Sequence, residues 1–250
     1  MCCKRFLGWL GYRGKRLFFP GFDLHARCRY KFLPRFFLHG LVDTLDAGLG
    51  NGYLSYAAYL RGNRVLAIDK DQKLVDKAES FFKKLGIDHR RLIFEVYNLY
   101  DLGKMQRKFD QIICSETLEH IKEDRLVVSY FYNLLQPGGV LHLCCPHANH
   151  PLHSFGRIDR PEELGHVRDG YTLESYKELL EPVGFKIVAS AGLGSPAITW
   201  IAEKARLLRE KQGDLFFLPF FLLSWPLQML DRLNPSLPFS IYIKALKPAD

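Results

Sequence analysis

A glycine-rich segment at residues 46–52, with the sequence DAGLGNG, constrains the fold of this chain more than any other feature. It lies between an apolar run at 41–45 and a helical pattern at 53–60. Glycines permit positive φ angles and let a ligand approach the backbone N–H groups at the start of a helix. A strand, a glycine turn and a helix in this order predict the first unit of an α/β fold that binds a ligand.

The rest of the chain alternates short apolar runs with helical periodicity, which is typical of a parallel α/β sheet. We expect further strands at 64–68, 92–96, 111–114, 140–145, 185–189 and 239–246. We expect helices from an Asp71 cap to a Gly86 stop, from about 118 to 135, from a Thr172 cap to 180, and near 197–209. The pattern therefore predicts one domain at 41–250, with an arm at 1–40 and an apolar insertion at 190–238 between the last two strands.

The spacing of the third glycine and of the next acid indicates the kind of ligand. A dinucleotide fingerprint needs its third glycine at position 53, which is Tyr53, whereas the third glycine here is Gly52. Asp69 ends the second strand 21 residues after Gly48, where a carboxylate can accept both hydroxyls of a ribose. These features predict an adenosyl ligand without a pyrophosphate.

Four later motifs accompany the loop: FDQIIC at 109–114, LEHI at 118–121, LLQPGG at 134–139 and GF at 184–185. With them the chain resembles, over roughly 41–188, the class I S-adenosylmethionine-dependent methyltransferases that carry a D-x-G-x-G-x-G loop. It is similar in particular to small-molecule O-methyltransferases of ubiquinone biosynthesis. The resemblance implies a Rossmann-like, doubly wound sheet of seven strands with the last strand antiparallel, and S-adenosylmethionine as the cofactor.

The resemblance also implies a set of cofactor residues. They are Asp46, Gly48, Leu49, Gly50, Gly52, Asp69, Lys70, Asn98, Leu99, Ser115 and Glu116. Asp46 and the glycines would line the methionine part, and Asp69 would bind the ribose. Asn98 stands where many relatives have an aspartate against the adenine amine, and Leu49 replaces a common cysteine without a polar role.

Methyl transfer to a hydroxyl requires alignment of the nucleophile with the methyl group and a base to take the proton. Histidine suits proton removal near pH 7, and we expect His120 or His166 to be the base. A structural role for His120 at the start of a helix is an equal alternative. The fourth strand ends in Cys-Ser-Glu-Thr and not in the Asn/Asp-Pro-Pro-aromatic loop of amino-methyltransferases, which disfavours amide and base nitrogens as acceptors.

A divalent metal is a further alternative. The spacing E-x-x-E-H, made by Glu116, Glu119 and His120 with His166 as a fourth ligand, resembles the metal site of ubiquinone-biosynthesis O-methyltransferases and small-RNA 2′-O-methyltransferases. We favour a metal-free site. The run His147, His150 and His153 lies between prolines and favours a solvated or substrate-facing loop over a metal site. Cys144 and Cys145 lie in an apolar run and are interpreted as buried small residues.

The arm carries the whole charge excess of +8, because residues 1–40 hold nine basic side chains and one acid, while the rest of the chain sums to zero. Its ten interleaved aromatic residues suit nucleic acid, an anionic membrane surface, or a segment that caps the cofactor with solvated cations. The aromatic stretch at 215–230 is too short to span a bilayer. It suits acyl chains or a hydrophobic substrate better than phosphates, or it packs on the sheet.

Six cysteines without a CxxC spacing, and no export signal, favour a reduced cytoplasmic setting. The sequence thus predicts a cytoplasmic methyltransferase that acts on a hydroxyl of a hydrophobic or lipid-linked small molecule, at the inner face of a membrane. The alternatives are an RNA 2′-O-methyltransferase and a membrane-associated protein that keeps the fold without turnover.

Overall fold

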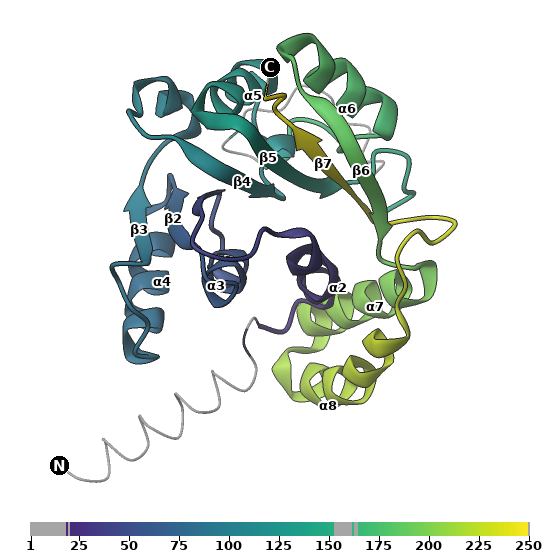
Figure 1. Ribbon diagram of the computed structural model, residues 1–250. Helices are drawn as coiled ribbons and strands as arrows, with labels where there is room; N and C mark the ends of the chain where they lie inside the picture. Colours follow the sequence, from purple (N-terminus) through teal and green to yellow (C-terminus); the bar gives the residue numbers. More distant parts are fainter. Residues whose placement is uncertain (1–18, 20, 153–161, 163–164, 250) are drawn as a thin grey trace, which may run out of the picture.

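A computed structural model describes residues 19, 21–152, 162 and 165–249 of the chain (Figure 1). Its centre is a seven-stranded sheet with the strand order β3-β2-β1-β4-β5-β7-β6. The strands are β1 (Asp43–Ala47), β2 (Arg64–Asp69), β3 (Leu92–Val96), β4 (Phe109–Ser115), β5 (Leu135–Pro146), β6 (Lys186–Leu193) and β7 (Ser240–Leu246). β1 to β5 pair in parallel, and β7 is antiparallel to both of its neighbours. The predicted Rossmann-like sheet, with its antiparallel last strand, is confirmed.

Helices cover both faces of this sheet. They are α2 (Leu24–Phe32), α3 (Tyr53–Leu60), α4 (Gln72–Lys84), α5 (Asp124–Leu134), α6 (Leu173–Leu180), α7 (Pro196–Gln212) and α8 (Asp214–Ser224). Short 3-10 turns are η1 (Leu33–Phe36), η2 (Leu99–Lys104), η3 (Leu118–His120), η5 (Glu181–Val183) and η6 (Trp225–Leu230). One core cluster joins the sheet to α5 and α6, and a second joins it to α2, η1, α3 and α4 (Figure 1).

Local capping explains why the helices begin where they were predicted to begin. The Asp71 carboxylate accepts the backbone N–H of Lys73 at 2.8 Å at the start of α4. Thr172 and Ser175 form a reciprocal capping box at the start of α6. These bonds satisfy N–H groups that the first helical turn leaves without partners.

The first strand begins later than predicted. It runs over Asp43–Ala47 and not 41–45, because Leu41 is 66% exposed and the parallel ladder to β2 begins at the pair Asp43 and Arg64. Asp46 is therefore a member of the strand and is buried in the sheet. The glycine loop starts directly at the strand's carboxyl end.

The predicted helix at 118–135 is wrong in its first third. η3 ends at His120, Ile121 has an extended backbone, and α5 starts only at Asp124. The Arg168 guanidinium donates hydrogen bonds to the carbonyl oxygens of Leu118, Ile121 and Lys122, at 2.8, 2.7 and 3.1 Å. Because these carbonyls are bound by a distant side chain, the segment forms a turn, in which Glu119 is buried and His120 is half-buried, and not a continuous helix.

Several boundaries in the second half of the chain also differ from the prediction. β5 starts at Leu135 and includes the Pro137-Gly138-Gly139 segment that was predicted to separate a helix from a strand. β6 continues to Leu193, where it pairs with Ser240 of β7, so the insertion begins after residue 193. These extensions depend on pairing between distant strands, which local sequence does not reveal.

The second half of the arm is folded onto the domain. Asp23 caps α2 by accepting the N–H groups of His25 and Ala26, and Cys28 and Phe32 enter the core over the sheet. Residues 1–18, which carry five of the nine cations, lie outside the described residues.

The apolar insertion packs mainly on the arm and not on the sheet. Phe217 and Phe221 of α8 form a separate cluster with Leu24 of α2 and with Ala202 and Ala205 of α7. Figure 1 shows α2 lying between α3 and the α7–α8 pair. Among the residues that the structure describes, we find no helix with both the length and the apolar character needed to cross a bilayer.

Candidate active site

A cavity of about 660 Å³ opens at the carboxyl ends of the parallel strands, where open α/β sheets bind ligands. Of the eleven predicted cofactor residues, ten line it: Asp46, Gly48, Leu49, Gly50, Asp69, Lys70, Asn98, Leu99, Ser115 and Glu116. His120 also lines it. Gly52 and His166 do not belong to its lining.

The three glycines of the loop occupy their positions for different geometric reasons. Gly48 has φ +90°, and a Cβ there would lie 2.3 Å from Thr117 Oγ1. Gly50 has φ +53°, and a Cβ there would meet no atom within 4 Å, so its backbone borders open space that a ligand can approach. At Gly52, which was predicted to line the methionine part, a Cβ would instead lie 2.7 Å from the Phe82 ring. Gly52 is thus required for packing of α3 on α4.

Two carboxylates, those of Asp46 and Asp69, lie next to the glycine loop. Asp46 is 1% exposed and accepts a hydrogen bond from Ser55 Oγ at 2.5 Å, and burial raises its pKa to about 7. Asp69 accepts the N–H of Asp71 at 3.0 Å and faces the N–H of Gly50 at 3.4 Å. Asp69 lines the cavity at the end of β2, where its carboxylate can receive ribose hydroxyls.

The wall opposite the glycine loop is made by the segment after β3. Asn98 caps η2 by accepting the N–H of Tyr100 at 3.1 Å, so its carbonyl oxygen already has one partner. Tyr97 and Tyr100 line the cavity on either side of Asn98 and Leu99. The combination of aromatic faces and an amide suits a flat heteroaromatic ring such as adenine.

An ion pair from the arm closes one side of the cavity. Arg29 of α2 lies with its Nη1 3.3 Å from Oε2 of Glu116, and both side chains line the cavity. Burial and the attraction of Glu116 act in opposite directions on the pKa of Arg29, and the net shift is upward. Glu116 itself has a left-handed backbone with φ 54°, a strained conformation that functional sites often hold. Of the four-ligand metal set considered from the sequence, Glu116 is the member whose ligand atoms do not join the others in the described part of the chain.

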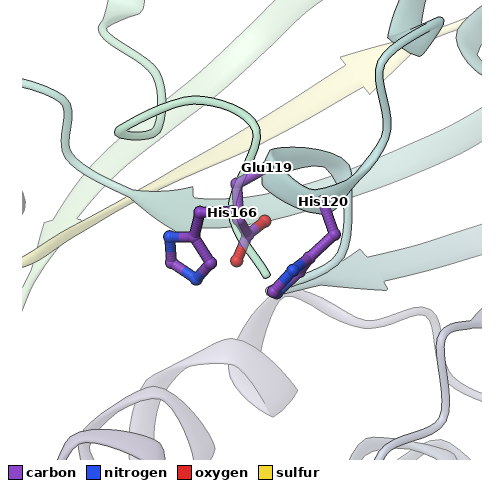
Figure 2. A group of neighbouring side chains, drawn as sticks. All are labelled: Glu119, His120 and His166. Carbon is purple, nitrogen blue, oxygen red and sulfur yellow. The ribbon is translucent and has the colours of Figure 1, made fainter. Parts of the chain in front are cut away.

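The other three members of that set do converge. Ligand atoms of Glu119, His120 and His166 all lie within 4.8 Å of one another, and Figure 2 shows the Glu119 carboxylate between the two imidazole rings. The rings of His120 and His166 meet edge to face at 4.5 Å. His166 is placed by the backbone bond from Val167 N to Glu119 O at 2.8 Å. The cluster thus joins η3 to the loop after β5.

The pKa shifts of Glu119, His120 and His166 favour the uncharged form of each side chain near pH 7. Burial raises the pKa of Glu119 to about 8, and the neighbouring Glu116 carboxylate adds to the rise. Burial also lowers the pKa of His120 and of His166, the latter further through the neighbouring His120. Neither oxygen of Glu119 has a hydrogen-bond partner among the described residues, although the weak S–H donor of Cys145 lies beside it. A buried carboxyl in that situation accommodates a cation or a proton.

Other polar and sulfur-bearing side chains near the carboxyl ends of the strands lie outside the cavity lining. His147 and His150 accept backbone N–H groups within their own turns, and His153 lies outside the described residues. Tyr171 donates to Asp124 at 2.7 Å, and Arg168 forms an ion pair with the same carboxylate. Cys144 and Cys145 are 1% and 0% exposed, as predicted for buried small residues.

The sequence reasoning missed several residues that line the cavity. They are Arg29, Tyr30, Asn51, Leu54, Leu74, Tyr97, Tyr100, Thr117, Ile121, Glu162 and Gly165. Arg29 and Tyr30 belong to the arm, whose cations were expected to bind phosphates or lipid headgroups or to be solvated, yet Arg27 and Arg29 are both buried. The usable signal was Asp23, a helix cap that starts α2 in the middle of the arm.

A strand, a glycine loop and a helix at the carboxyl edge of a doubly wound sheet, with an acid at the end of the next strand, are typical of domains that bind a nucleotide-like cofactor. The family model described as "Methyltransferase domain" matches residues 38–184, more than half of the chain. The chain belongs to this family, and carries a class I S-adenosylmethionine-dependent methyltransferase domain.

Two curated relatives and one solved structure illustrate the likeness. A "Probable S-adenosylmethionine-dependent methyltransferase" of Mycolicibacterium smegmatis is 29% identical over 151 residues, which cover 60% of this chain and 54% of that protein. A "Ubiquinone biosynthesis O-methyltransferase" of Azotobacter vinelandii is 28% identical over 143 residues, which cover 49% and 60%. The chain therefore spans less than two thirds of the length of either relative.

An S-adenosylmethionine dependent methyltransferase from Mesorhizobium loti has a similar structure, with a TM-score of 0.60 at 17% identity over 89% of this chain and 99% of that one. At this level of identity the likeness supports the fold alone.

Proposed function

We propose that this chain is an S-adenosylmethionine-dependent O-methyltransferase whose acceptor is a hydroxyl of a hydrophobic or lipid-linked small molecule. The observation that carries the proposal is the position of His120 on the wall of the cavity that the glycine loop and Asp69 also line. The lowered pKa of His120 keeps its imidazole neutral at pH 7, in the form that accepts a proton. The similarity to the Azotobacter vinelandii protein, a ubiquinone biosynthesis O-methyltransferase, supports an oxygen acceptor.

The residues of the cavity fit the cofactor. The open side of Gly50 admits a ligand to the loop backbone, Asp69 offers oxygens to a ribose, and the segment of Tyr97 and Asn98 offers a surface for adenine. S-adenosylmethionine, when bound, supplies an electrophilic methyl on a sulfonium whose departure leaves a neutral thioether. His120 takes the proton of the acceptor hydroxyl as the new C–O bond forms. The cavity wall would align the acceptor oxygen with the methyl, and such alignment is the larger part of this kind of catalysis.

Labelled cofactor provides the test. Extracts incubated with isotopically labelled S-adenosylmethionine and the protein are searched by mass spectrometry for the labelled species, which we expect to be an apolar methyl ether. His120→Asn should lower kcat about 100-fold or more with little change in cofactor affinity, because it removes a general base. His89→Asn, at an exposed histidine outside the cavity, is the matched control. A labelled RNA would contradict the proposed acceptor, and absence of any labelled product would favour a protein without turnover.

We also propose that the cluster of Glu119, His120 and His166 is able to hold a divalent cation. One carboxylate and two imidazoles form a donor set that suits divalent transition metals, and the orphaned carboxylate of buried Glu119 fits a cation. Such an ion would orient acceptor hydroxyls, and His120 would then be a ligand and not the base. Thermal unfolding with and without Mn²⁺ separates the alternatives. A rise in the Tm of the native protein with Mn²⁺ that is absent in His166→Asn supports the metal site. If Mn²⁺ does not change the Tm of the native protein, the metal site is excluded.

The proposed setting is an anionic membrane surface. Large apolar side chains stand exposed on α8 and η6, a surface we call the apolar ridge: Phe216, Leu222, Leu223, Leu227, Met229 and Leu230, with exposures from 43% to 82%. The sequence 1–18, which precedes the described residues, has five cations and no acid. Apolar contact together with basic charge is the combination that binds peripheral proteins to anionic lipid.

Vesicle co-sedimentation tests the setting with the full-length chain. We expect binding to vesicles with anionic lipid, weakened by Leu223→Glu in the ridge and by replacing Lys4, Arg5, Arg13, Lys15 and Arg16 with glutamine. Val188→Glu, an exposed apolar position on β6, is the control. Equal binding by all variants would refute a role for the ridge and the arm.

A further inference from the structure

A second cavity, of about 550 Å³, lies between the arm and the insertion. Its walls come from α2, from the start of α3 and from η6, and include Tyr53, Trp225 and Met229. The volume is within the range of small-molecule sites. Tyr30 lines both this cavity and the one at the glycine loop. The other residues that line the second cavity do not line the first.

Tyr30 joins the two cavities. It lines both, its ring packs on Tyr53 with centroids 4.4 Å apart, and its hydroxyl donates to Asn51 Oδ1 at 3.2 Å in the glycine loop. A molecule that occupies the second cavity therefore contacts the same side chain that borders the cofactor. Because the two cavities are neighbours across Tyr30, the second is a candidate place for the part of an acceptor that does not react.

The lining favours an uncharged apolar occupant. Among the described residues, the walls hold aromatic rings, a proline, a thioether, one amide (Gln228) and no carboxylate. Its two cations are engaged within the protein. Lys31 donates to the carbonyl oxygens of Gln228, Met229 and Asp231 at 2.8 to 3.0 Å. Arg27 bonds Gly21 O at 2.7 Å and lies 4.5 Å from the centroid of the Trp225 ring. Lys31 also holds the end of η6, and thereby the far wall of the cavity.

The cavity also borders the apolar ridge, since Met229 belongs to both and is 82% exposed. The apolar ridge and the cavity therefore adjoin at Met229.

We propose that this cavity binds the apolar portion of the methyl acceptor and that Tyr30 positions the acceptor between it and the cofactor cavity. The proposal rests on the proposed function for the identity of the occupant. It predicts that affinity grows with the length of an apolar chain attached to a hydroxyl. Each methylene that enters the cavity should tighten binding about fourfold.

Straight-chain alcohols from butanol through hexanol to octanol serve as probes, and Trp225 serves as the reporter. The chain has three tryptophans, so a Trp9→Phe, Trp200→Phe background leaves Trp225 alone. Met229→Gln should weaken octanol several-fold and butanol little, because it puts a polar group in the apolar wall at a position whose exposure tolerates it. Leu223→Gln, 79% exposed on α8 and outside the cavity, is the matched control and should leave octanol binding unchanged.

Two results would overturn the proposal: affinity that does not depend on chain length, or an equal loss in Leu223→Gln, which would assign the effect to the ridge. The same titrations are repeated with saturating S-adenosylmethionine. Octanol should still bind, whereas displacement would place it in the cofactor cavity and contradict a separate acceptor site. If S-adenosylmethionine fails to bind at all, the proposed function fails, while the response of Trp225 to chain length still decides whether the cavity binds apolar chains.

Discussion

Asp46 is a buried acid whose protonation changes on folding. Burial raises its pKa from 3.8 to about 7. Between these values the folded protein keeps a proton that the unfolded chain has released, so stability falls as pH rises from about 4 to about 7. We expect Asp46→Asn to remove this part of the pH dependence. In the cofactor-free protein the variant should match the native one near pH 4 and exceed it by about 2–4 kcal/mol above pH 7.

Urea unfolding across this pH range measures the difference. Asp76→Asn, at an exposed position of α4, is the control and should follow the native curve. A native-minus-variant difference that is constant with pH would show that Asp46 is not protonated in the folded state.

Gly48 and Gly50 are expected to respond differently to alanine. At Gly48 the new Cβ meets Thr117 Oγ1 and has an unfavourable φ, so Gly48→Ala should destabilise the protein by about 2–4 kcal/mol. At Gly50 only the φ is unfavourable, and the expected loss is about 1–2 kcal/mol, with a larger loss of cofactor binding because the Cβ borders the cavity. A double-mutant cycle of Gly48→Ala with Thr117→Ala should show coupling of about 1 kcal/mol or more. If the changes in the free energy of unfolding for Gly48→Ala and Thr117→Ala are strictly additive, the contact between the new Cβ and Thr117 is not the cause of the destabilisation.

At the scale of elements, the ion pair of Arg29 and Glu116 connects α2 to the end of β4. Arg29→Met should destabilise the protein by about 3 kcal/mol, because it leaves a mostly buried carboxylate without its partner. The double variant Arg29→Met, Glu116→Gln should recover most of the free energy of unfolding that Arg29→Met loses. Arg35→Met, an exposed cation beside α2, should change stability by less than about 0.5 kcal/mol. Equal losses in the single and double variants would show that the arm is held by its apolar contacts and not by this pair. Chemical unfolding provides all four values.

The elements that sequence predicted well are those with local signals. The glycine loop, the Asp71 and Thr172 caps and the alternating apolar runs each lie within a few residues of the element they define, and their bounds hold to within a few residues. The break in the helix expected at 118–135 depends on Arg168, which is far along the chain. No local pattern around residue 120 could reveal it.

The difference between local signals and contacts of distant residues also applies to the candidate active site. The residues expected to bind the cofactor lie in contiguous motifs, and ten of the eleven line the cavity. Arg29, Tyr30 and the second cavity depend on how the arm and the insertion pack, and their sequences carry no family motif. The buried network of Gln111, His142 and Tyr242 within the sheet is likewise a product of strand pairing.

At the scale of the whole molecule, the charge excess of the arm has two parts. The part that the structure describes contributes Arg29 to the cofactor cavity and Arg27 and Lys31 to the wall of the second cavity. These cations are bound by the protein, so they are not a free basic surface for nucleic acid. The five cations of residues 1–18 are the ones that the membrane proposal uses.

We expect the cavity at the glycine loop to bind S-adenosylmethionine, with Asp69 as the ribose ligand. Isothermal titration of the full-length protein with S-adenosylmethionine tests it most directly. We expect one saturable site, and a loss of about 10-fold to 100-fold in Asp69→Ala, since two hydrogen bonds to a carboxylate are removed. Asp76→Ala should bind like the native protein. Absence of binding, or equal affinity in Asp69→Ala and the native protein, would contradict the account.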